Sequence, residues 1–211
     1  MDLAPLFGLR LRTPRLELRL PTDDELEQLR EVALAGVHPP EFMPFTIAWT
    51  DEPELGTFLD YHETRRREWS PDAWHLELGV RVDEEPVGVQ AVTATEFAAT
   101  RLVSTGSWLG ERFQRRGVGT EMRTAILELA FRGLGAEAAR SGAIDGNAAS
   151  MRVSEKLGYR VVGRGAVEPR GIPTGHTDLE IRRDEWRPAV PVEIEGLEPC
   201  LPLFGIAPPQ G

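Results

Sequence analysis

Residues 114–120 have the composition of a phosphate-binding loop that leads directly into a helix. Gly117 and Gly119 allow a tight turn and a close approach of the backbone to a ligand. The first turn of a helix offers N–H groups without intrahelical acceptors, and the helix dipole favours an anion at that end. We therefore expect a phosphorylated ligand to bind at Gln114, Arg115, Arg116, Gly117, Val118, Gly119 and Thr120.

The distribution of charge favours a small phosphorylated ligand over a nucleic acid. The whole chain has a net charge of −10, which opposes the many phosphate contacts that nucleic-acid binding needs. Residues 112–123, in contrast, carry four arginines and one glutamate. ATP and NAD are poorly supported, because the P-loop lysine with its hydroxyl neighbour and a complete G-x-G-x-x-G motif are both missing.

The segments on either side of the loop predict how it is held. Residues 103–110 have the pattern of a strand, and the apolar spacing of residues 118–130 predicts a helix with one buried stripe. Further along, Asn147 is placed to cap a short helix and Gly158 to end it, before a new strand. The loop is thus expected between a strand and a helix.

With these flanks the chain resembles the GNAT superfamily of acyl-CoA-dependent N-acyltransferases. In that family a Q/R-x-x-G-x-G/A motif binds the pyrophosphate of coenzyme A, and an N-x-x-S/A motif followed by K-L-G-F/Y comes later; both are present here, in order. The resemblance covers residues 10–186. Residues 11–19 and 108–110 resemble the RimJ/RimL-type branch, whose members acetylate the N-termini of ribosomal proteins. Residues 43–50, 106–110 and 202–205 resemble an actinobacterial subgroup, for which succinyl-CoA is an alternative donor.

The resemblance implies an α+β fold, with a central mixed, mostly antiparallel sheet of about seven strands and helices on both faces. It also implies acetyl-CoA as the donor. The strand before the loop would bind pantetheine through the backbone of Trp108, Leu109 and Gly110, and Asn147 and Ser150 would complete the coenzyme site.

Periodicity predicts the remaining elements and the limits of the domain. Helices are expected within residues 22–36 and 51–69, and strands at residues 11–19, 74–80, 87–92, 138–144, 159–163 and 177–183. Residues 1–187 would form a single domain, and residues 188–211 a proline-rich tail that packs on the domain or on a partner subunit. The Pro-Leu-Phe-Gly sequence at residues 5–8 recurs at 202–205, either by coincidence or as paired anchors of a homo-oligomer.

Direct acyl transfer requires a neutral amine, a polarised thioester carbonyl and a proton for the departing thiolate, without a covalent enzyme intermediate. Many GNAT members have a tyrosine as the acid at the position of Ser154, and RimL-like members use a serine at the position of Ser150. Ser150 is therefore the first candidate acid and Ser154 the second, although Ser154 could be a hydroxyl on the helix surface. Glu96 is the candidate base through a water molecule; His75 and Glu77, which share one strand face, are its rivals, or else a solvated surface pair.

The acceptor is less well defined by the sequence. Met43, Phe45, Trp49, His75 and Glu77 are candidate acceptor-binding residues, although such aromatic side chains also serve as core. A protein or peptide N-terminal amine is the leading acceptor, with a small amine or an aminoglycoside as the alternative. A non-catalytic acyl-CoA-binding protein is a second alternative, and a structural interaction protein without coenzyme A is a third.

Several other classes are disfavoured. The four histidines show no metal-ligand spacing, so no metal is predicted, and the single Cys200 excludes an intramolecular disulfide. No apolar run approaches the roughly 20 residues of a membrane-spanning helix. We therefore expect a cytoplasmic enzyme that binds neither membrane nor nucleic acid.

Overall fold

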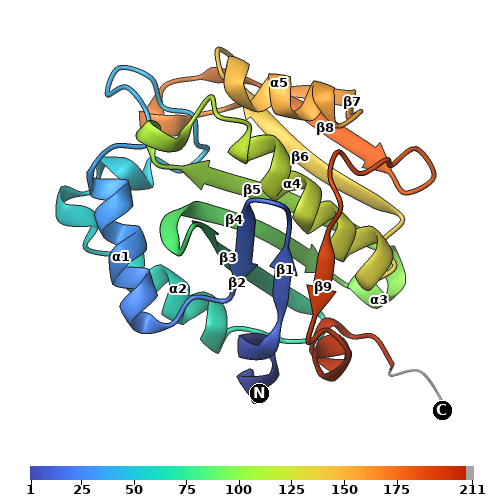
Figure 1. The fold of residues 1–211 in the computed structure, drawn as a ribbon. Helices are drawn as coiled ribbons and strands as arrows, with labels where there is room; N and C mark the ends of the chain where they lie inside the picture. Colours follow the sequence, from blue (N-terminus) through green and yellow to red (C-terminus); the bar gives the residue numbers. More distant parts are fainter. Residues whose placement is uncertain (208–211) are drawn as a thin grey trace.

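The computed structural model describes residues 1–207, and its centre is a nine-stranded sheet in the order β7-β8-β6-β5-β4-β3-β2-β1-β9 (Figure 1). All neighbouring strands pair antiparallel except β5 and β6, which are parallel. The strands are β1 (Arg10–Arg12), β2 (Leu16–Arg19), β3 (Ala73–Val82), β4 (Glu85–Thr95), β5 (Leu102–Leu109), β6 (Ala138–Ile144), β7 (Arg160–Val167), β8 (Thr174–Arg182) and β9 (Glu193–Glu195).

The sheet confirms the expected mixed, mostly antiparallel architecture, but it has nine strands instead of about seven. One extra strand arises because residues 11–19 form two strands. Pro14, which has no N–H for a ladder, lies in the turn between them, where Thr13 N–H donates to Leu16 O at 3.0 Å. The other extra strand is β9, which pairs with β1 and comes from the proline-rich tail. The last four residues of that tail lie outside the described residues.

Helices cover both faces of the sheet, as expected (Figure 1). The helices α1 (Asp23–Leu34) and α2 (Phe58–Arg67) pack on one face, and α4 (Val118–Glu128) and α5 (Ala148–Lys156) lie on the other. The one-turn helix α3 (Phe97–Thr100) follows β4. Seven shorter elements complete the fold: η1 (Ala4–Gly8), η2 (Trp49–Asp51), η3 (Pro53–Leu55), η4 (Glu111–Phe113), η5 (Leu129–Gly133), η6 (Pro169–Gly171) and η7 (Glu198–Phe204).

The two helices on the α1 face match the sequence differently. Thr22 and Glu25 form the expected capping box at the start of α1. The helix expected from residue 51 begins only at Phe58, because Glu54 and Leu55 have positive φ and interrupt it. The irregular chain between α1 and α2 thereby becomes longer than the sequence pattern indicates.

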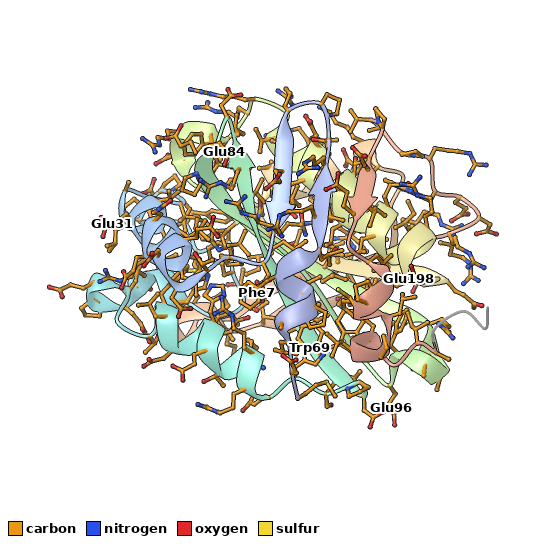
Figure 2. All side chains as sticks on the ribbon, turned by 60° about the horizontal axis from the view of Figure 1, so that its bottom comes forward. Phe7, Glu31, Trp69, Glu84, Glu96 and Glu198 are labelled. Atoms are coloured by element: carbon orange, nitrogen blue, oxygen red, sulfur yellow. The ribbon has the colours of Figure 1, made fainter. Side chains whose placement is uncertain are left out.

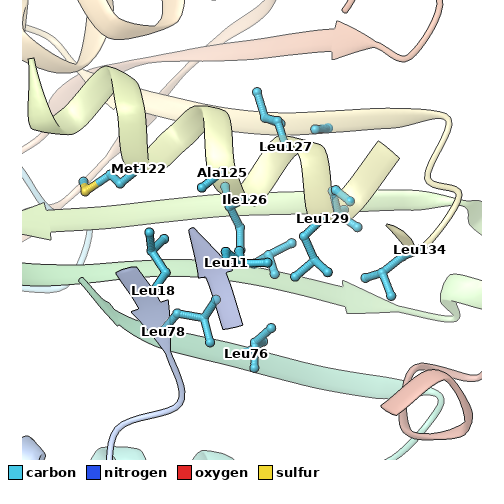
Figure 3. Packing of buried hydrophobic residues seen from close by; sticks show 14 of the residues in the cluster. Leu11, Leu18, Leu76, Leu78, Met122, Ala125, Ile126, Leu127, Leu129 and Leu134 are labelled. Atoms are coloured by element: carbon cyan, nitrogen blue, oxygen red, sulfur yellow. The ribbon is translucent and has the colours of Figure 1, made fainter. Parts of the chain in front are cut away.

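The core lies mainly between α4 and the sheet. Apolar side chains of α4 and η5 contact those of β1, β2 and β3, and this cluster is drawn in Figure 3: Leu11, Leu18, Leu76, Leu78, Met122, Ala125, Ile126, Leu127, Leu129 and Leu134. Every residue of α4 from Glu121 to Glu128 is buried. This helix is therefore fixed rigidly, and the loop that precedes it is fixed at one end.

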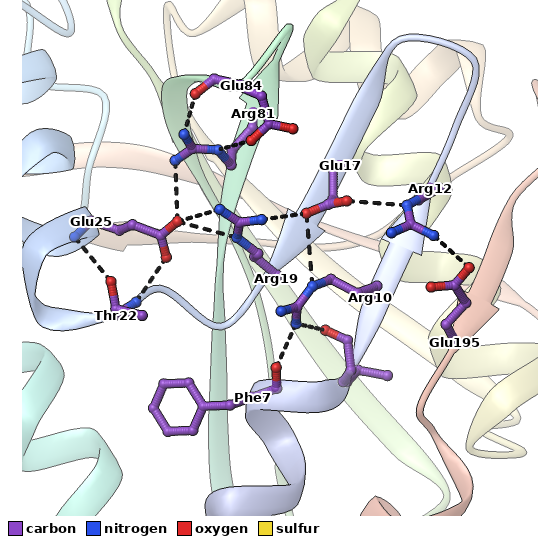
Figure 4. A network of polar contacts seen from close by, with 11 residues as sticks. Phe7, Arg10, Arg12, Glu17, Arg19, Thr22, Glu25, Arg81, Glu84 and Glu195 are labelled. Carbon is purple, nitrogen blue, oxygen red and sulfur yellow. Dashed lines mark hydrogen bonds and ion pairs between the residues drawn. The ribbon is translucent and has the colours of Figure 1, made fainter.

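A polar network ties both ends of the chain to the sheet (Figure 4). Glu17 lies between Arg12 and Arg19, and Arg12 also pairs with Glu195 of β9. Glu25 of the capping box pairs with Arg19 and, at 3.4 Å, with Arg81. The network holds β1, β2, β3, β9 and the start of α1 in one unit.

The two Pro-Leu-Phe-Gly sequences lie in η1 and η7, which are in contact within the chain. Leu6 and Phe204 are fully buried, and Trp69 Nε1 donates to Leu203 O at 2.9 Å. Both sequences thus contribute buried apolar side chains at one end of the sheet, near Phe7 and Trp69 in Figure 2. Their use in a homo-oligomer stays a prediction.

Candidate functional site

The parallel pair β5 and β6 separates after three residue pairs. Leu102 to Ser104 pair with Ala138 to Arg140, whereas the strands continue to Leu109 and Ile144 without pairing to each other. Along this half, β5 still pairs with β4, and its edge toward β6 offers backbone N–H and C=O groups to a ligand. A cavity of about 1680 Å³ includes this opening and is lined by side chains from both faces of the sheet.

The predicted phosphate-binding loop lies at one end of this cavity. Arg115 and Gly117 have positive φ, at 60° and 82°, and Gly117 is the N-cap of α4. Within residues 1–207 the backbone N–H groups of Gly117, Val118 and Gly119 have no hydrogen-bond acceptor; the first bonds run from Thr120 and Glu121 to Gly117 O. The loop has the free donors and the helix terminus that a pyrophosphate needs.

Contacts with distant segments hold the loop in shape. The Gln114 amide donates to Leu109 O at 2.9 Å and to Val37 O at 2.7 Å, which joins the loop to the end of β5 and to the chain after α1. On the opposite side, Arg15 Nη1 donates to Arg116 O at 3.1 Å. The acceptors are backbone carbonyls, and the donors are the side chains of Gln114 in the loop and of Arg15 outside it.

Glu121 is a positioning residue that sequence reasoning missed. Its carboxylate is 4% exposed and accepts bonds from Thr13 Oγ1 at 2.6 Å, Arg15 N–H at 3.1 Å and Arg15 Nε at 2.7 Å. The turn between β1 and β2 is thereby fixed to the first turn of α4. A charged residue within a helix turn predicted to be buried, next to the loop, was the available signal.

The helix α5 contributes the second predicted group of coenzyme-site residues. Asn147 Oδ1 caps α5 by accepting from Ser150 N–H at 3.0 Å, as expected, and both residues line the cavity. Ser154 is fully buried, so it is not on the helix surface, and it does not line the cavity. Among the described residues its hydroxyl has no hydrogen-bond partner.

The other end of the cavity, on the α1 and α2 face, is aromatic and includes the carboxylate of Glu77. Phe45, Trp49, Phe58 and Trp108 form a chain of ring contacts with centroids 5.3–6.1 Å apart. Glu77 on β3 is half-buried beside them, and the Tyr61 hydroxyl donates to it at 2.9 Å. Aromatic side chains beside a half-buried carboxylate suit a ligand that carries an amine on an apolar body.

Register explains why Glu77 faces open space. Glu77 pairs with Ala91 on β4, and Ala91 with Gly106 on β5, so the three residues form one row on the cavity side of the sheet. A Cβ atom added to Gly106 would have no neighbour within 4 Å. Because Ala91 and Gly106 are small, no large side chain stands on the sheet between Glu77 and the opening beside β5.

Burial changes the ionisation of the groups at this end. Burial raises the pKa of Glu77, although the Tyr61 hydrogen bond opposes the shift, and burial also raises the pKa of Tyr61. Burial lowers the pKa of His75 and brings that of His62 down to about 4. Both histidines are therefore neutral at pH 7, and Glu77 has a carboxylate of enhanced basicity.

The contacts of Arg170 with Asp51 and Pro40, called the strap below, join two segments on the outer side of the cavity. Arg170, in the turn between β7 and β8, binds both Asp51 carboxylate oxygens at 2.6 Å and donates to Pro40 O at 2.9 Å. The contact joins the long α1–α2 connection to the β7–β8 hairpin. The aromatic end of the cavity is thus bounded by segments that lie more than a hundred residues apart.

The cavity brings together most, but not all, of the predicted site residues. Those that line it are Trp108, Leu109, Gln114, Arg115, Gly117, Gly119, Thr120, Asn147, Ser150, Phe45, Trp49, His75 and Glu77. Gly110, Arg116, Val118 and Met43 lie outside the lining; a Cβ on Gly110 would be only 2.7 Å from Val32 of α1. Glu96 is exposed at the rim of the molecule, after β4, and the structure does not bring it to the cavity (Figure 2).

Comparison with known proteins decides the family. Residues 15–160, more than half of the chain, match the acetyltransferase (GNAT) domain family. The chain belongs to the GNAT family. Its class is therefore that of an acyl-CoA-dependent N-acyltransferase, and the loop at residues 114–120 lies within the matched segment.

Solved GNAT structures have the same fold at low sequence identity. Mycobacterium smegmatis RimJ in complex with CoA-disulfide has a TM-score of 0.69 at 18% identity, covering 86% of this chain and 90% of RimJ. RimL, a ribosomal L7/L12 alpha-N-protein acetyltransferase in complex with coenzyme A, has a TM-score of 0.67 at 15% identity, covering 81% and 95%. A GNAT acetyltransferase from Bacillus anthracis has a TM-score of 0.65 at 15% identity, covering 83% and 99%.

Residues 1–207 offer neither a membrane-spanning helix nor a metal cluster. No helix there is long and apolar enough to cross a membrane. No group of three or more potential metal-ligating side chains occurs in the same residues.

Proposed function

We propose that this enzyme is a RimJ/RimL-type acyltransferase that moves an acyl group from acyl-CoA to the N-terminal amine of a protein or peptide. The observation that carries the proposal is the continuity of the cavity. It runs from the free N–H groups at Gly117 through the opening beside β5 to the aromatic end at Glu77. A thioester held in that opening would be reached by coenzyme A from one side and by an amine from the other.

The reaction needs no covalent enzyme intermediate. The amine nitrogen attacks the thioester carbon, an amide bond forms, the carbon–sulfur bond breaks, and the thiolate takes up a proton as the amine loses one. Backbone N–H groups on the unpaired half of β5 are available to polarise the carbonyl. Most of the rate enhancement would come from holding the two reactants together.

Glu77 is the base in this proposal, in place of Glu96. It faces the cavity, whereas Glu96 lies at the rim, and its raised pKa favours proton uptake. The Tyr61 hydroxyl orients the carboxylate. Ser150, at the cavity wall on the first turn of α5, is the group proposed to protonate or hydrogen-bond the departing sulfur.

A peptide N-terminus fits the aromatic end better than a polycationic sugar does. Phe45, Trp49 and Trp108 offer an apolar surface for the first side chain of a peptide, while Glu77 takes the amine. One neighbour of similar fold, RimL, is a protein alpha-N-acetyltransferase. An aminoglycoside carries several cationic amines, whereas two of the three carboxylates that line the cavity among the described residues already have partners on the chain beside them: Glu52 accepts from Thr57, and Asp178 pairs with His176.

The test is acyl transfer to a peptide panel. Peptides that differ in the first residue, each with a free or a blocked N-terminal amine and an internal lysine, are incubated with acyl-CoA and analysed by tandem mass spectrometry. We expect one added acyl group on the free N-terminus and none on blocked peptides. Modification of small amines only would contradict the proposed acceptor. Binding of coenzyme A without any turnover would favour the non-catalytic alternative.

A further inference from the structure

Arg123 of α4 lies at the opening between β5 and β6, where it lines the cavity although it is only 5% exposed. Its Nη1 donates to Ser141 Oγ on β6 at 3.0 Å, and its Nη2 donates to Ser107 Oγ on β5 at 3.1 Å. The guanidinium therefore joins the two strands beyond the point where their pairing ends. The other cationic side chains that line the cavity among the described residues are exposed: Arg115, Arg140, Arg152 and Lys156.

The charge of Arg123 is not compensated within residues 1–207. Its two hydrogen-bond partners are neutral hydroxyls, and its Nε has no partner among these residues. A guanidinium has five N–H donors, so three of them remain without an acceptor. Because burying an unpaired charge is costly, the position suits an anion that is present only when the substrates are bound.

The other buried charges of α4 are compensated within the chain. Glu121 is bonded to Arg15, and Glu128 is bonded to Arg132 at 3.1 Å and to Trp186 Nε1 at 2.6 Å. Both glutamates are 8% exposed or less, as Arg123 is. Of these three buried charges, only Arg123 lines the cavity. The uncompensated charge of α4 is therefore the one that faces the substrates.

The alternation of side chains along β5 places Arg123 and Glu77 on opposite faces of the sheet. Gly106 lies in one row with Ala91 and Glu77, on the face that α1 and α2 cover. The next residue, Ser107, points to the other face, where it accepts from Arg123 of α4. The opening thus has a carboxylate on one face and a guanidinium on the other.

The charges that form during acyl transfer require the same arrangement. In the proposed reaction the amine arrives from the Glu77 side and coenzyme A from the Gly117 side. The nitrogen becomes positively charged as it bonds to the thioester carbon. The carbon–sulfur bond then breaks, and its electron pair stays on the sulfur as a thiolate. Arg123 faces the side on which this negative charge develops.

The helix α5 brings the proposed acid to the same side. A Cβ atom added to Gly119 would lie 3.5 Å from Val153 of α5, so this face of α4 packs on α5. Arg123 follows Gly119 by one helical turn on the same face. Arg123 and Ser150 both line the cavity. The cavity therefore offers a thiolate both a cation, from α4, and a hydroxyl that can give a proton, from α5.

We propose that Arg123 is a catalytic residue that stabilises the thiolate of coenzyme A as it departs from the acyl group. This inference rests on the proposed function and adds a cation on the leaving-group side to the base on the amine side. A fixed positive charge in a water-poor setting stabilises a thiolate more than a neutral thioester, which lowers the barrier to cleavage of the carbon–sulfur bond. Arg123 keeps its own protons. The thiolate takes up a proton as the amine loses one to Glu77, and coenzyme A leaves as the thiol.

The test measures the thiol of bound coenzyme A and needs no turnover. The full-length enzyme in complex with coenzyme A is titrated with base, and the ultraviolet absorbance of the thiolate is followed. The reference is the complex with S-methyl-coenzyme A, which has no ionisable thiol. In the wild type we expect the pKa of the bound thiol to lie about 1–3 below that of free coenzyme A. It should return toward the free value in Arg123→Gln, which has no charge, and stay low in Arg123→Lys, which keeps the charge.

Kinetics and a matched control complete the test. Arg123→Gln should lower kcat by about 10²–10³-fold, as does the loss of one donor to a developing anion, and should leave the Kd of coenzyme A at neutral pH nearly unchanged. Arg164→Gln removes an exposed arginine of β7 that does not line the cavity, and it should retain the wild-type thiol pKa and kcat.

Two results would overturn the role of Arg123 while leaving the proposed function intact. One is a bound thiol with the same pKa in the wild type as in free coenzyme A. The other is a wild-type kcat in Arg123→Gln. A wild type that does not bind coenzyme A at all would contradict the proposed function and, with it, this inference.

Discussion

The donor half of the site (residues 102–158) and the acceptor half (residues 37–77 with residues 168–173) are built in different ways. The donor half is one continuous stretch of strand, loop and helices, and it offers backbone N–H groups to the proposed coenzyme. The acceptor half is assembled from an irregular connection, one face of β3 and a distant hairpin turn. A site made of consecutive backbone can be assigned a ligand from sequence, whereas separated side chains such as Phe45, Trp49 and Glu77 can be named as candidates but not given their roles.

Charge differs between the halves in the same way. The donor half presents arginines and a helix N-terminus to the cavity, as a phosphorylated ligand requires. The acceptor half presents one carboxylate of raised pKa and two histidines of lowered pKa, as an amine acceptor requires. Changes in the two halves should therefore affect donor binding and turnover separately.

The largest effect is expected from Gly117→Asp in the donor half. A side chain at φ 82° is strained, and a carboxylate at the loop repels phosphate. Loss of two charge-assisted hydrogen bonds corresponds to about 3–6 kcal/mol, or roughly 10²–10⁴-fold in the Kd of coenzyme A. Calorimetric titration measures this Kd. The matched control is Gly135→Asp, which also has positive φ but nothing within 4 Å, and it should bind coenzyme A normally. Equal affinity in both variants would refute the loop assignment.

Glu77→Gln should lower kcat by about 10²–10⁴-fold, because an amide cannot take the amine proton. The Kd of coenzyme A should not change, since Glu77 lies in the acceptor half. Glu63→Gln, on the exposed side of α2, is the control and should retain full activity. If Glu77→Gln weakened coenzyme A binding as strongly as it slowed turnover, the separation of the two halves would fail.

The pH profile of kcat/KM sharpens the same assignment. The active form of Glu77 is the carboxylate, so activity should fall as the pH drops through its raised pKa. The Tyr61 hydrogen bond lowers that pKa, and its removal in Tyr61→Phe should move the acidic limb to higher pH. An acidic limb that stays in place, or moves to lower pH, would argue against Glu77 as the base.

A smaller effect is expected from Glu121→Gln. This variant tests whether the donor half depends on the distant β1–β2 turn, to which Glu121 is bonded. The charged hydrogen bonds to Thr13 and Arg15 would be replaced by weaker ones, at a cost of about 1.5–3 kcal/mol in the free energy of unfolding. Urea denaturation measures this change. Glu155→Gln, exposed on α5, should have little effect. If both variants were equally stable, the β1–β2 turn would not hold the loop helix.

The smallest effect is expected from Arg170→Ala. Exposed ion pairs contribute about 0–1 kcal/mol to stability, so folding should hardly change. The KM for the peptide acceptor should rise about two- to fivefold, because the strap positions the α1–α2 connection, while the KM for acyl-CoA stays constant. Arg182→Ala on β8 is the control for loss of an exposed arginine. An altered KM for acyl-CoA would show that the strap serves the donor half.

Particular residues show how far sequence reasoning reached. The caps at Thr22 and Asn147 were predictable because capping depends on residues three positions apart. The tail strand β9 was missed because it depends on pairing with β1 across the fold, and the split at Pro14 and the late start of α2 were missed because local backbone geometry interrupts the hydrophobic pattern there. In the same way Glu77 outranks Glu96 only through the register of β3, β4 and β5, and Arg123 stands out only through its burial.

The most direct test of the account is the melting temperature of the wild type with coenzyme A, acetyl-CoA, succinyl-CoA and ATP in turn. A ligand at 100 times its Kd adds about 2.7 kcal/mol, which corresponds to a rise in Tm of about 5–10 °C for a protein of this size. We expect such a rise with the three coenzyme A compounds and none with ATP. No specific rise with any coenzyme A compound would contradict the donor half as the binding site and, with it, the proposed transfer reaction.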